Sequence, residues 1–127
     1  MVQIQIDPQD LKKTLESIET ALLSFDRQLL YKAMLISEEV IVNLINHANF
    51  QTKTPDISLY IQKDENLSLI FKDNAQPFNI LTYPDPSFND NIEKKKLGGL
   101  GIYLIKKYAK KVSYHSQNGV NTLKVVL

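Results

Sequence analysis

The sequence predicts an α/β fold in one domain that spans residues 1–127. Three observations support this prediction. Five short segments have the alternating or β-rich apolar pattern of strands, three have the three- and four-residue spacing of helices, and 43% of the residues are hydrophobic. Because domains cluster near ~100 to 150 residues, the chain has room for one folded unit. We therefore expect the strands and helices to share a single core.

Composition excludes several classes of protein. No segment approaches the ~18 to 20 consecutive apolar residues of a membrane span, and the first eight residues lack the basic start and apolar block of a signal peptide. We therefore expect a cytoplasmic protein with no membrane partner. The chain has no cysteine and two histidines, which excludes disulfides, thiolate metal sites and cysteine nucleophiles. Carboxylates, amides, hydroxyls, lysines and the backbone remain for chemistry.

Charge is unevenly distributed along the chain. Residues 1–90 contain 7 basic and 13 acidic residues, whereas residues 91–127 contain 8 basic and 1 acidic. The basic run Lys94, Lys95 and Lys96 lies just before three glycines, which favours a small anionic ligand over nucleic acid. The alternative is a solvated basic helix, and charge by itself does not choose between the two. We expect no direct contact with nucleic acid.

The first half predicts one strand and two helices. Val2 to Ile6 alternates apolar and polar residues, as a short strand does. Asp7-Pro8 then supplies a helix start, and the amphipathic pattern continues to about Ser24. Asp26 is an expected N-cap for a second helix from Arg27 to about Asn49, which contains neither glycine nor proline.

The second helix carries the most informative pattern. At 100° per residue its polar side includes Glu39 and Asn43, closely flanked by Leu35, Ile36 and Val42. A carboxylate half buried among apolar neighbours costs free energy unless it has a partner, so this row indicates a ligand or metal. The alternative is a surface glutamate with an incidental asparagine. The predicted buried side comprises Leu30, Met34, Ile41, Leu44, Ile45 and Ala48.

The middle of the chain predicts a hairpin and a long loop. Strands over Asp56–Ile61 and Leu67–Phe71 are joined by a turn at residues 63–66, and Asp73 lies just past the second strand. Residues 75–97 contain three of the five prolines and no glycine. Loops beyond ~12 to 15 residues are usually functional lids or mobile segments, so we expect a lid here.

The last third predicts a glycine-rich turn, a helix and a hairpin. Gly98-Gly99-Leu100-Gly101 directly precedes an apolar-periodic run from Ile102 to Ala109. Glycines before a helix start expose backbone N–H groups and allow a phosphate to approach, although a glycine cluster can also be a flexible joint. Val112–Ser116 and Thr122–Leu127 then predict two strands joined by an Asn-Gly turn.

Taken together, these motifs resemble a known family. Glu39-x-x-x-Asn43 on a helix, Asp73-x-Ala75-x-Pro77-Phe78 after a strand, and then the glycine cluster before a helix resemble the ATP-binding fold of gyrase-type ATPases and histidine kinases. Within that superfamily the chain looks most like the anti-sigma-factor serine protein kinases, over essentially its whole length. The resemblance implies a two-layer α/β sandwich, with a mixed and largely antiparallel sheet covered on one face by three helices.

The resemblance also implies roles for individual residues. Asn43 would coordinate the Mg²⁺ that bridges the phosphates of ATP, and Asp73 would accept a hydrogen bond from the adenine amino group. Glu39 would be the general base toward an attacking hydroxyl. Ala75 replaces a glycine usual in the family, so the backbone there would be less able to adopt a positive φ or to approach the base, which predicts weaker nucleotide binding. The remaining implied nucleotide-binding residues are Pro77, Gly98, Gly99, Leu100 and Gly101.

The implied activity is that of a Mg-ATP-dependent serine/threonine protein kinase in transcription regulation. Such kinases sequester a sigma factor and phosphorylate an anti-sigma-factor antagonist in a partner switch, and they are often homodimers. An ATP-binding interaction module without phosphotransfer is the alternative. A histidine-kinase catalytic domain is a weaker interpretation, because no dimerisation helices with an acceptor histidine precede Val2 in this sequence.

Overall fold

The computed structural model of the chain describes residues 1–82 and 99–127. Three parts of the predictions lie outside the described residues. They are Gly98 as a nucleotide-binding residue, the basic run at 94–96 and most of the predicted lid. In chain order the elements are β1 (Val2–Gln5), α1 (Leu11–Leu22), α2 (Arg27–His47), β2 (Ile57–Lys63), β3 (Leu67–Asp73), the short 3-10 helix η1 (Ile80–Thr82), α4 (Gly99–Tyr108), β4 (Lys111–Gln117) and β5 (Val120–Val126).

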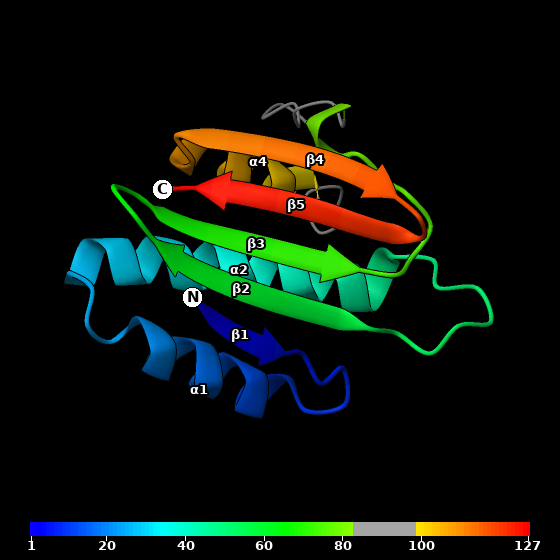
Figure 1. Cartoon of the computed structure of the whole chain (residues 1–127), viewed down its shortest axis with the longest axis horizontal. Coiled ribbons are helices and arrows are strands. Elements are labelled where there is room, and N and C mark those ends of the chain that lie inside the picture. The colour runs from blue at the N-terminus through cyan, green and yellow to red at the C-terminus, as the bar shows by residue number, and fades with distance from the viewer. Residues whose placement is uncertain (83–98) are drawn as a thin grey trace.

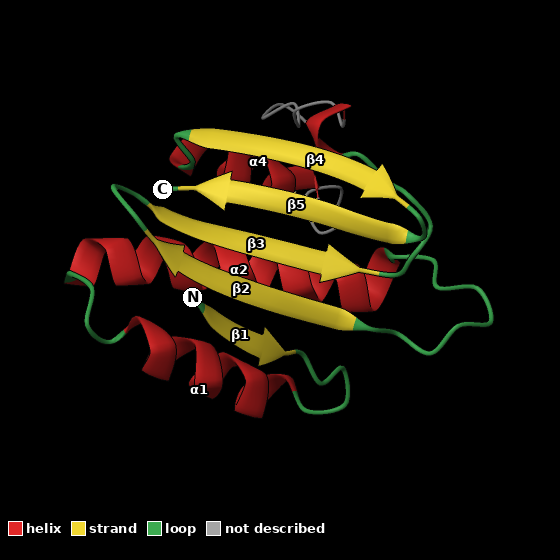
Figure 2. Cartoon of the chain, in the orientation of Figure 1, coloured by secondary structure: helices red, strands yellow, loops and turns green. Residues whose placement is uncertain are grey.

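The strands form one sheet with the order β1-β2-β3-β5-β4. Figure 1 shows β5 inserted between β3 and β4, with α2 and α4 behind the sheet and α1 beside the β1 edge. The predicted two-layer α/β fold is confirmed, and Figure 2 shows the two layers by colour. The prediction of a mixed sheet is wrong for the described strands, because every neighbouring pair is antiparallel. Tight hairpins enforce this within β2-β3 and β4-β5.

The core lies between the sheet and its helices. Residues of α1, α2 and α4 meet the inner faces of the central strands, and the strand residues in contact with them are almost inaccessible to solvent. Strand periodicity explains the inner face, since alternate residues of β2 and β3 point toward the helices. The largest fully buried side chains are Phe71, Ile18, Leu22, Ile36, Ile41, Ile57, Leu59, Leu67, Leu69, Ile105 and Val125.

Helix α2 packs most of the predicted apolar side against the core, but its most deeply buried residues lie to one side of the predicted ones. Of the six residues expected to be buried, only Ile41 is fully so, and the other five are partly exposed. Ile36, expected beside the polar row, is buried, and the small residues Ala33 and Ser37 are at the centre of the contact. The most deeply buried residues of α2 therefore lie to one side of the predicted ones, which depends on what packs around the helix and not only on which residues are apolar.

One helix boundary differs from the prediction, because a side chain forms a hydrogen bond with a backbone N–H group near the helix start. Helix α1 begins at Leu11, three residues after Pro8, and its N-cap is Asp10 rather than Asp7. The Asp7 carboxylate instead accepts a hydrogen bond from the backbone N–H of Gln9 at 2.9 Å and closes a separate turn. Helix α2 begins at Arg27 as predicted, with the Asp26 side chain accepting from the N–H of Leu29 at 3.1 Å.

Both predicted hairpin turns are confirmed. The backbone of Asn118 and Gly119 has φ of 54° and 79°, the left-handed pair that a two-residue hairpin of this twist requires. The β2-β3 turn is closed by a bond from the N–H of Asp64 to the carbonyl of Asn66 at 3.1 Å. Asp73 is the last residue of β3 rather than the first beyond it.

We expect Asp26→Ala to lower the free energy of unfolding by about 1 kcal/mol, because the substitution removes an N-cap hydrogen bond. Urea unfolding monitored by circular dichroism measures the change. Asp26→Ser is the matched control, since serine also caps, and it should retain at least half of the lost stability. Equal losses in the two variants would show that the cap does not stabilise α2.

Candidate functional site

The inner face of the sheet ends in a polar row. Strand register aligns Asp73 of β3 with Asn121 of β5, and Asn121 with Ser116 of β4. Alternation along β3 and β5 places Asp73 and Asn121 on the same face as the core residues Phe71 and Leu123. Three neighbouring strands therefore bring a carboxylate, a carboxamide and a hydroxyl together where the apolar core stops.

The carboxamide of Asn121 is the centre of this row. The side chain is 3% exposed, and its Nδ2 donates to Asp73 Oδ1 and to the carbonyl of Ala75, both at 2.8 Å. Its Oδ1 accepts from the hydroxyl of Ser116 at 2.7 Å and from that of Tyr114 at 3.1 Å. Two donor hydrogens and two acceptor positions are thus all used, so the buried amide has one orientation.

The two oxygens of Asp73 are unequally occupied as a result. Oδ1 accepts from Asn121 and from the N–H of Ala75 at 2.9 Å. Oδ2 has no hydrogen-bond donor within residues 1–82 and 99–127, and the side chain is half-buried. The site therefore offers one oriented acceptor at the end of the sheet, suited to a ligand N–H donor such as an exocyclic amino group.

Ala75 occupies its position without backbone strain. Among the described non-glycine residues only Gln51 and Asn118 have positive φ, so Ala75 does not adopt the positive φ considered for this position. That alanine weakens nucleotide binding stays a prediction. The Asx turn formed by the Asp73 carboxylate and the Ala75 N–H holds the backbone in an ordinary conformation. Ala75 itself is buried at 6% exposure.

The segment that follows Ala75 is held from two sides. Gln76 donates its N–H to the carbonyl of Asn49 at 2.8 Å, and the Asn49 side-chain Nδ2 donates to Gln76 Oε1 at 3.2 Å. Phe78 donates its N–H to the hydroxyl of Tyr114 at 3.0 Å. Pro77 lies exposed between these anchors. The end of α2 and strand β4 thus both position the chain where it leaves β3.

Glu39 and Asn43 lie one turn apart on α2, and both are half-buried. Burial raises the pKa of the Glu39 carboxyl above its ordinary value, and the neighbouring negative charge of Glu38 raises it further. The Asn43 carboxamide makes no hydrogen bond to any other residue in the described ranges. This row therefore pairs a carboxylate of increased basicity with an amide that is available to a ligand.

Helix α4 contributes backbone rather than side chains. Gly99, Leu100 and Gly101 form its first turn instead of a loop before it, which corrects the predicted boundary. Glycine is tolerated in this turn, whose first N–H groups have no partner within the helix. Helix α4 packs beside α2 and runs in the opposite direction, so its N-terminus lies toward the C-terminal half of α2 (Figure 1). That N-terminus is electropositive.

The described residues offer no ready-made metal cluster. Within residues 1–82 and 99–127 no group of three or more histidine, aspartate or glutamate side chains could hold a metal ion. A cation near Asn43 would take most of its ligands from phosphate oxygens and water, which is how Mg²⁺ is commonly held in nucleotide sites.

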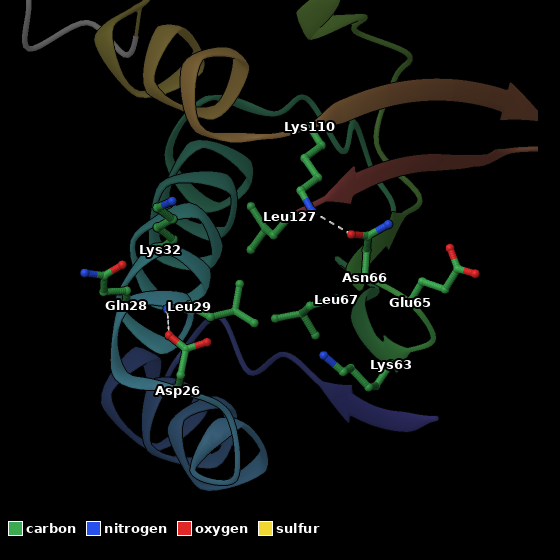
Figure 3. Close-up of a pocket in the computed structure, with 10 residues that line it drawn as sticks. All are labelled: Asp26, Gln28, Leu29, Lys32, Lys63, Glu65, Asn66, Leu67, Lys110 and Leu127. Carbon is green, nitrogen blue, oxygen red and sulfur yellow. Dashed lines mark hydrogen bonds between the residues drawn. The ribbon is translucent and has the colours of Figure 1, made fainter.

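A separate hollow of about 280 Å³ lies at the opposite end of the sheet, beside the β2-β3 turn (Figure 3). Lys32, Lys63 and Lys110 surround it, and Lys110 donates to Asn66 Oδ1 at 2.7 Å. None of the predicted site residues lines it. The hollow is therefore not part of the site at Asp73 and α2.

Comparison with known proteins places this geometry in a family. The family model described as histidine kinase-like ATPase domain matches residues 4–127. The chain belongs to this family. No curated protein matches the sequence. Membership shows that the chain is an ATP-binding domain of the kinase-like ATPase type, and the structure is consistent with it, since Asp73 Oδ2 can accept from adenine and the first turn of α4 can receive phosphate. In the described part of this ATPase domain no helix has the length and apolarity to cross a membrane.

Sequence reasoning missed Asn121, Tyr114 and Ser116. A signal for Asn121 was present, because it interrupts the alternation that otherwise places Leu123, Val125 and Leu127 on the inner face. A polar residue at an inward position of a strand needs buried partners, which points to a network. Tyr114 and Ser116 become recognisable only once the β4-β5 register is known.

We expect Asn121→Ala to lower the free energy of unfolding by about 2 to 3 kcal/mol, because it removes four hydrogen bonds, including the buried one to the carbonyl of Ala75. It should also weaken ADP binding at least tenfold, since Asp73 loses its orienting donor. Urea unfolding and calorimetric titration with Mg-ADP measure the two effects. Ser116→Ala removes one bond on the other side of the amide and should change ADP affinity by less than threefold. Unchanged ADP affinity in Asn121→Ala would contradict the positioning role.

Proposed function

We propose that this ATPase domain is a Mg-ATP-dependent serine/threonine protein kinase, an anti-sigma-type regulator that phosphorylates an antagonist protein in a partner switch. The observation that carries the proposal is the pair Glu39 and Asn43. A carboxylate of raised pKa and an amide without a hydrogen-bond partner among the described residues are half-buried, four residues apart on α2. Nucleotide binding needs the amide, whereas the carboxylate becomes useful when a proton has to be removed.

In this proposal three structural elements each bind a different part of Mg-ATP. Asp73 accepts a hydrogen bond from the adenine amino group through Oδ2, with Asn121 holding the carboxylate in place. The first-turn N–H groups of Gly99, Leu100 and Gly101 donate to phosphate oxygens. Asn43 supplies one oxygen to the Mg²⁺, whose charge balances that of the phosphates.

Glu39 then acts on the acceptor hydroxyl. The hydroxyl oxygen forms a bond to the γ-phosphorus, the bond from that phosphorus to the bridging oxygen breaks, and ADP leaves with the electron pair. The hydroxyl proton passes to Glu39. Helix α2 keeps the base about 6 Å along the helix axis from the metal ligand, because four residues rise about 1.5 Å each. A serine or threonine of a partner protein is the acceptor in this scheme.

We expect Glu39→Gln to abolish phosphotransfer while it leaves Mg-ADP binding intact. Thermal unfolding with Mg²⁺, with and without ADP, measures binding, and transfer of the γ-phosphate from labelled ATP measures activity. A ligand at about 100 times its dissociation constant stabilises by roughly 2.7 kcal/mol, which raises the Tm by several degrees in a domain of this size.

Asn43→Ala and Asp73→Asn should lose that rise in Tm, because each removes a proposed contact to nucleotide or metal. A parent protein that shows the ADP-dependent rise but no transfer to protein or peptide would instead be an ATP-binding interaction module. Transfer that survives in Glu39→Gln would exclude Glu39 as the base.

We expect the acid limb of the pH-rate profile to shift to lower pH in Glu38→Gln. Glu39 must be ionised to accept a proton, and its raised pKa places the loss of activity at a higher pH than an ordinary glutamate would. Removing the charge of Glu38 removes one cause of that shift, so activity should persist further into the acid range. Phosphotransfer rates between pH 4 and pH 8 (about the span where carboxylates titrate) test this, and Glu19→Gln on α1 is the control that should not move the limb.

A further inference from the structure

Glu39 and Asn43 are the last two members of a row of four residues on α2. Tyr31, Leu35, Glu39 and Asn43 follow one another at intervals of four, which places each roughly one turn above the last on the same strip of the helix. The first two members are apolar. They lead from the N-terminal half of the helix directly to the proposed base.

The apolar end of this row is open to solvent. Tyr31 is 62% exposed and Leu35 is 37% exposed, although both belong to a helix whose other apolar residues are mostly buried or half-buried. The residues of α2 in the core are Ala33, Ile36, Val40 and Ile41, on a different side of the helix. Both side chains therefore present apolar surface to solvent. An exposed apolar pair beside a reactive group is typical of a surface that receives a partner.

We propose that the row from Tyr31 to Glu39, the acceptor row, binds the phosphoacceptor as an extended segment of a partner protein. Apolar side chains two and four residues from the acceptor hydroxyl would pack on Leu35 and Tyr31 respectively. The inference rests on the proposed kinase function and adds to it the sequence preference of the substrate.

The spacing follows from backbone geometry. Four helical residues rise about 6 Å, and two residues of an extended strand advance about 6.6 Å. Alternate residues of the bound segment therefore have nearly the same spacing as the residues of the acceptor row. Side chains at alternate strand positions also point to the same face. A hydroxyl opposite Glu39 therefore places the residue two positions away opposite Leu35 and the residue four positions away opposite Tyr31. Both partners are large apolar groups, which select apolar side chains over polar ones.

The position of the base argues for a protein segment as the occupant. Glu39 is half-buried, and the side of α2 bearing Ile36 and Val40 is closed by the core, so the acceptor reaches Glu39 from the exposed side that also carries Leu35. Water, the alternative acceptor, makes no use of the apolar pair. The acceptor row is thus continuous with the proposed catalytic position and adds contacts that only a larger acceptor can make.

The test uses synthetic peptides of a dozen residues with one serine. One set has leucine two and four residues from the serine on its N-terminal side, a second has leucine at the same distances on its C-terminal side, and a third has asparagine at all these positions. We expect the intact protein with Mg-ATP to phosphorylate one of the leucine sets with kcat/KM at least tenfold above the asparagine set. Which set is preferred gives the direction of the segment along α2.

Substitutions in the acceptor row then show whether the row causes the preference for leucine peptides. Leu35→Gln and Tyr31→Gln should each lower kcat/KM for the preferred peptide about tenfold, mainly through KM, and should abolish most of the leucine preference. Leu23→Gln is the matched control, because Leu23 is also 62% exposed but lies outside the row, and it should change nothing. The ADP-dependent rise in Tm should be the same in all three variants and the parent, which shows that the nucleotide site is intact.

The outcomes separate the inference from the function it rests on. Equal phosphorylation of leucine and asparagine peptides, or a leucine preference that survives both glutamine variants, would overturn the acceptor row and leave the kinase intact. Phosphorylation of no peptide despite the ADP-dependent rise would count against the kinase function and the acceptor row together. Sedimentation equilibrium tests whether a second copy of the chain occupies the acceptor row instead. A parent dimer that becomes monomeric in Tyr31→Gln and Leu35→Gln would show that it does, and would overturn the inference.

Discussion

The four hydrogen bonds of the Asn121 carboxamide hold together the end of the molecule where ATP binding is expected. They join β3, β4 and β5 at the point where the apolar core gives way to polar groups, and they connect Asp73 to the chain that leaves β3 at Ala75. Because the amide is buried, each bond replaces one that water would otherwise make, and loss of any partner leaves an unsatisfied group. The orientation of Asp73, and with it the free acceptor Oδ2, depends on this residue.

Helix α2 has two different tasks on its two sides. Its inner side buries Ile36, Val40 and Ile41 in the core, which anchors the helix against the same core that supports the Asp73 strand. Its lateral side carries Glu39 and Asn43 in a half-buried environment. Partial burial raises the pKa of Glu39 without isolating the carboxylate from an incoming group, which is the compromise that a general base requires. One helix therefore relates the core, the proposed base and the proposed amide ligand.

Much of the secondary structure and the family could be predicted from the local chemistry of the sequence. The Asn-Gly pair determines the last hairpin, since those residues adopt positive φ at little cost, and Asp26 marks the start of α2 because its side chain caps the helix. The interval of four between Glu39 and Asn43 puts them on one side of any helix, and the order of the three motifs indicated the family that the comparison then showed. Each of these inferences depends on residues close together in the chain.

Tertiary structure alone decided the rest, because it depends on residues far apart in the chain. Asp73 and Asn121 are 48 positions apart and meet only through the β3-β5 register, and Phe78 reaches Tyr114 across 36. The rotation of α2 likewise depends on the elements that pack around it, which include α1 and α4. Periodicity reports which residues are apolar, whereas burial depends on what packs against them. The sequence by itself therefore determined the elements and the candidate site residues, and packing decided which oxygen of Asp73 is hydrogen-bonded within residues 1–82 and 99–127 and which residues of α2 are buried.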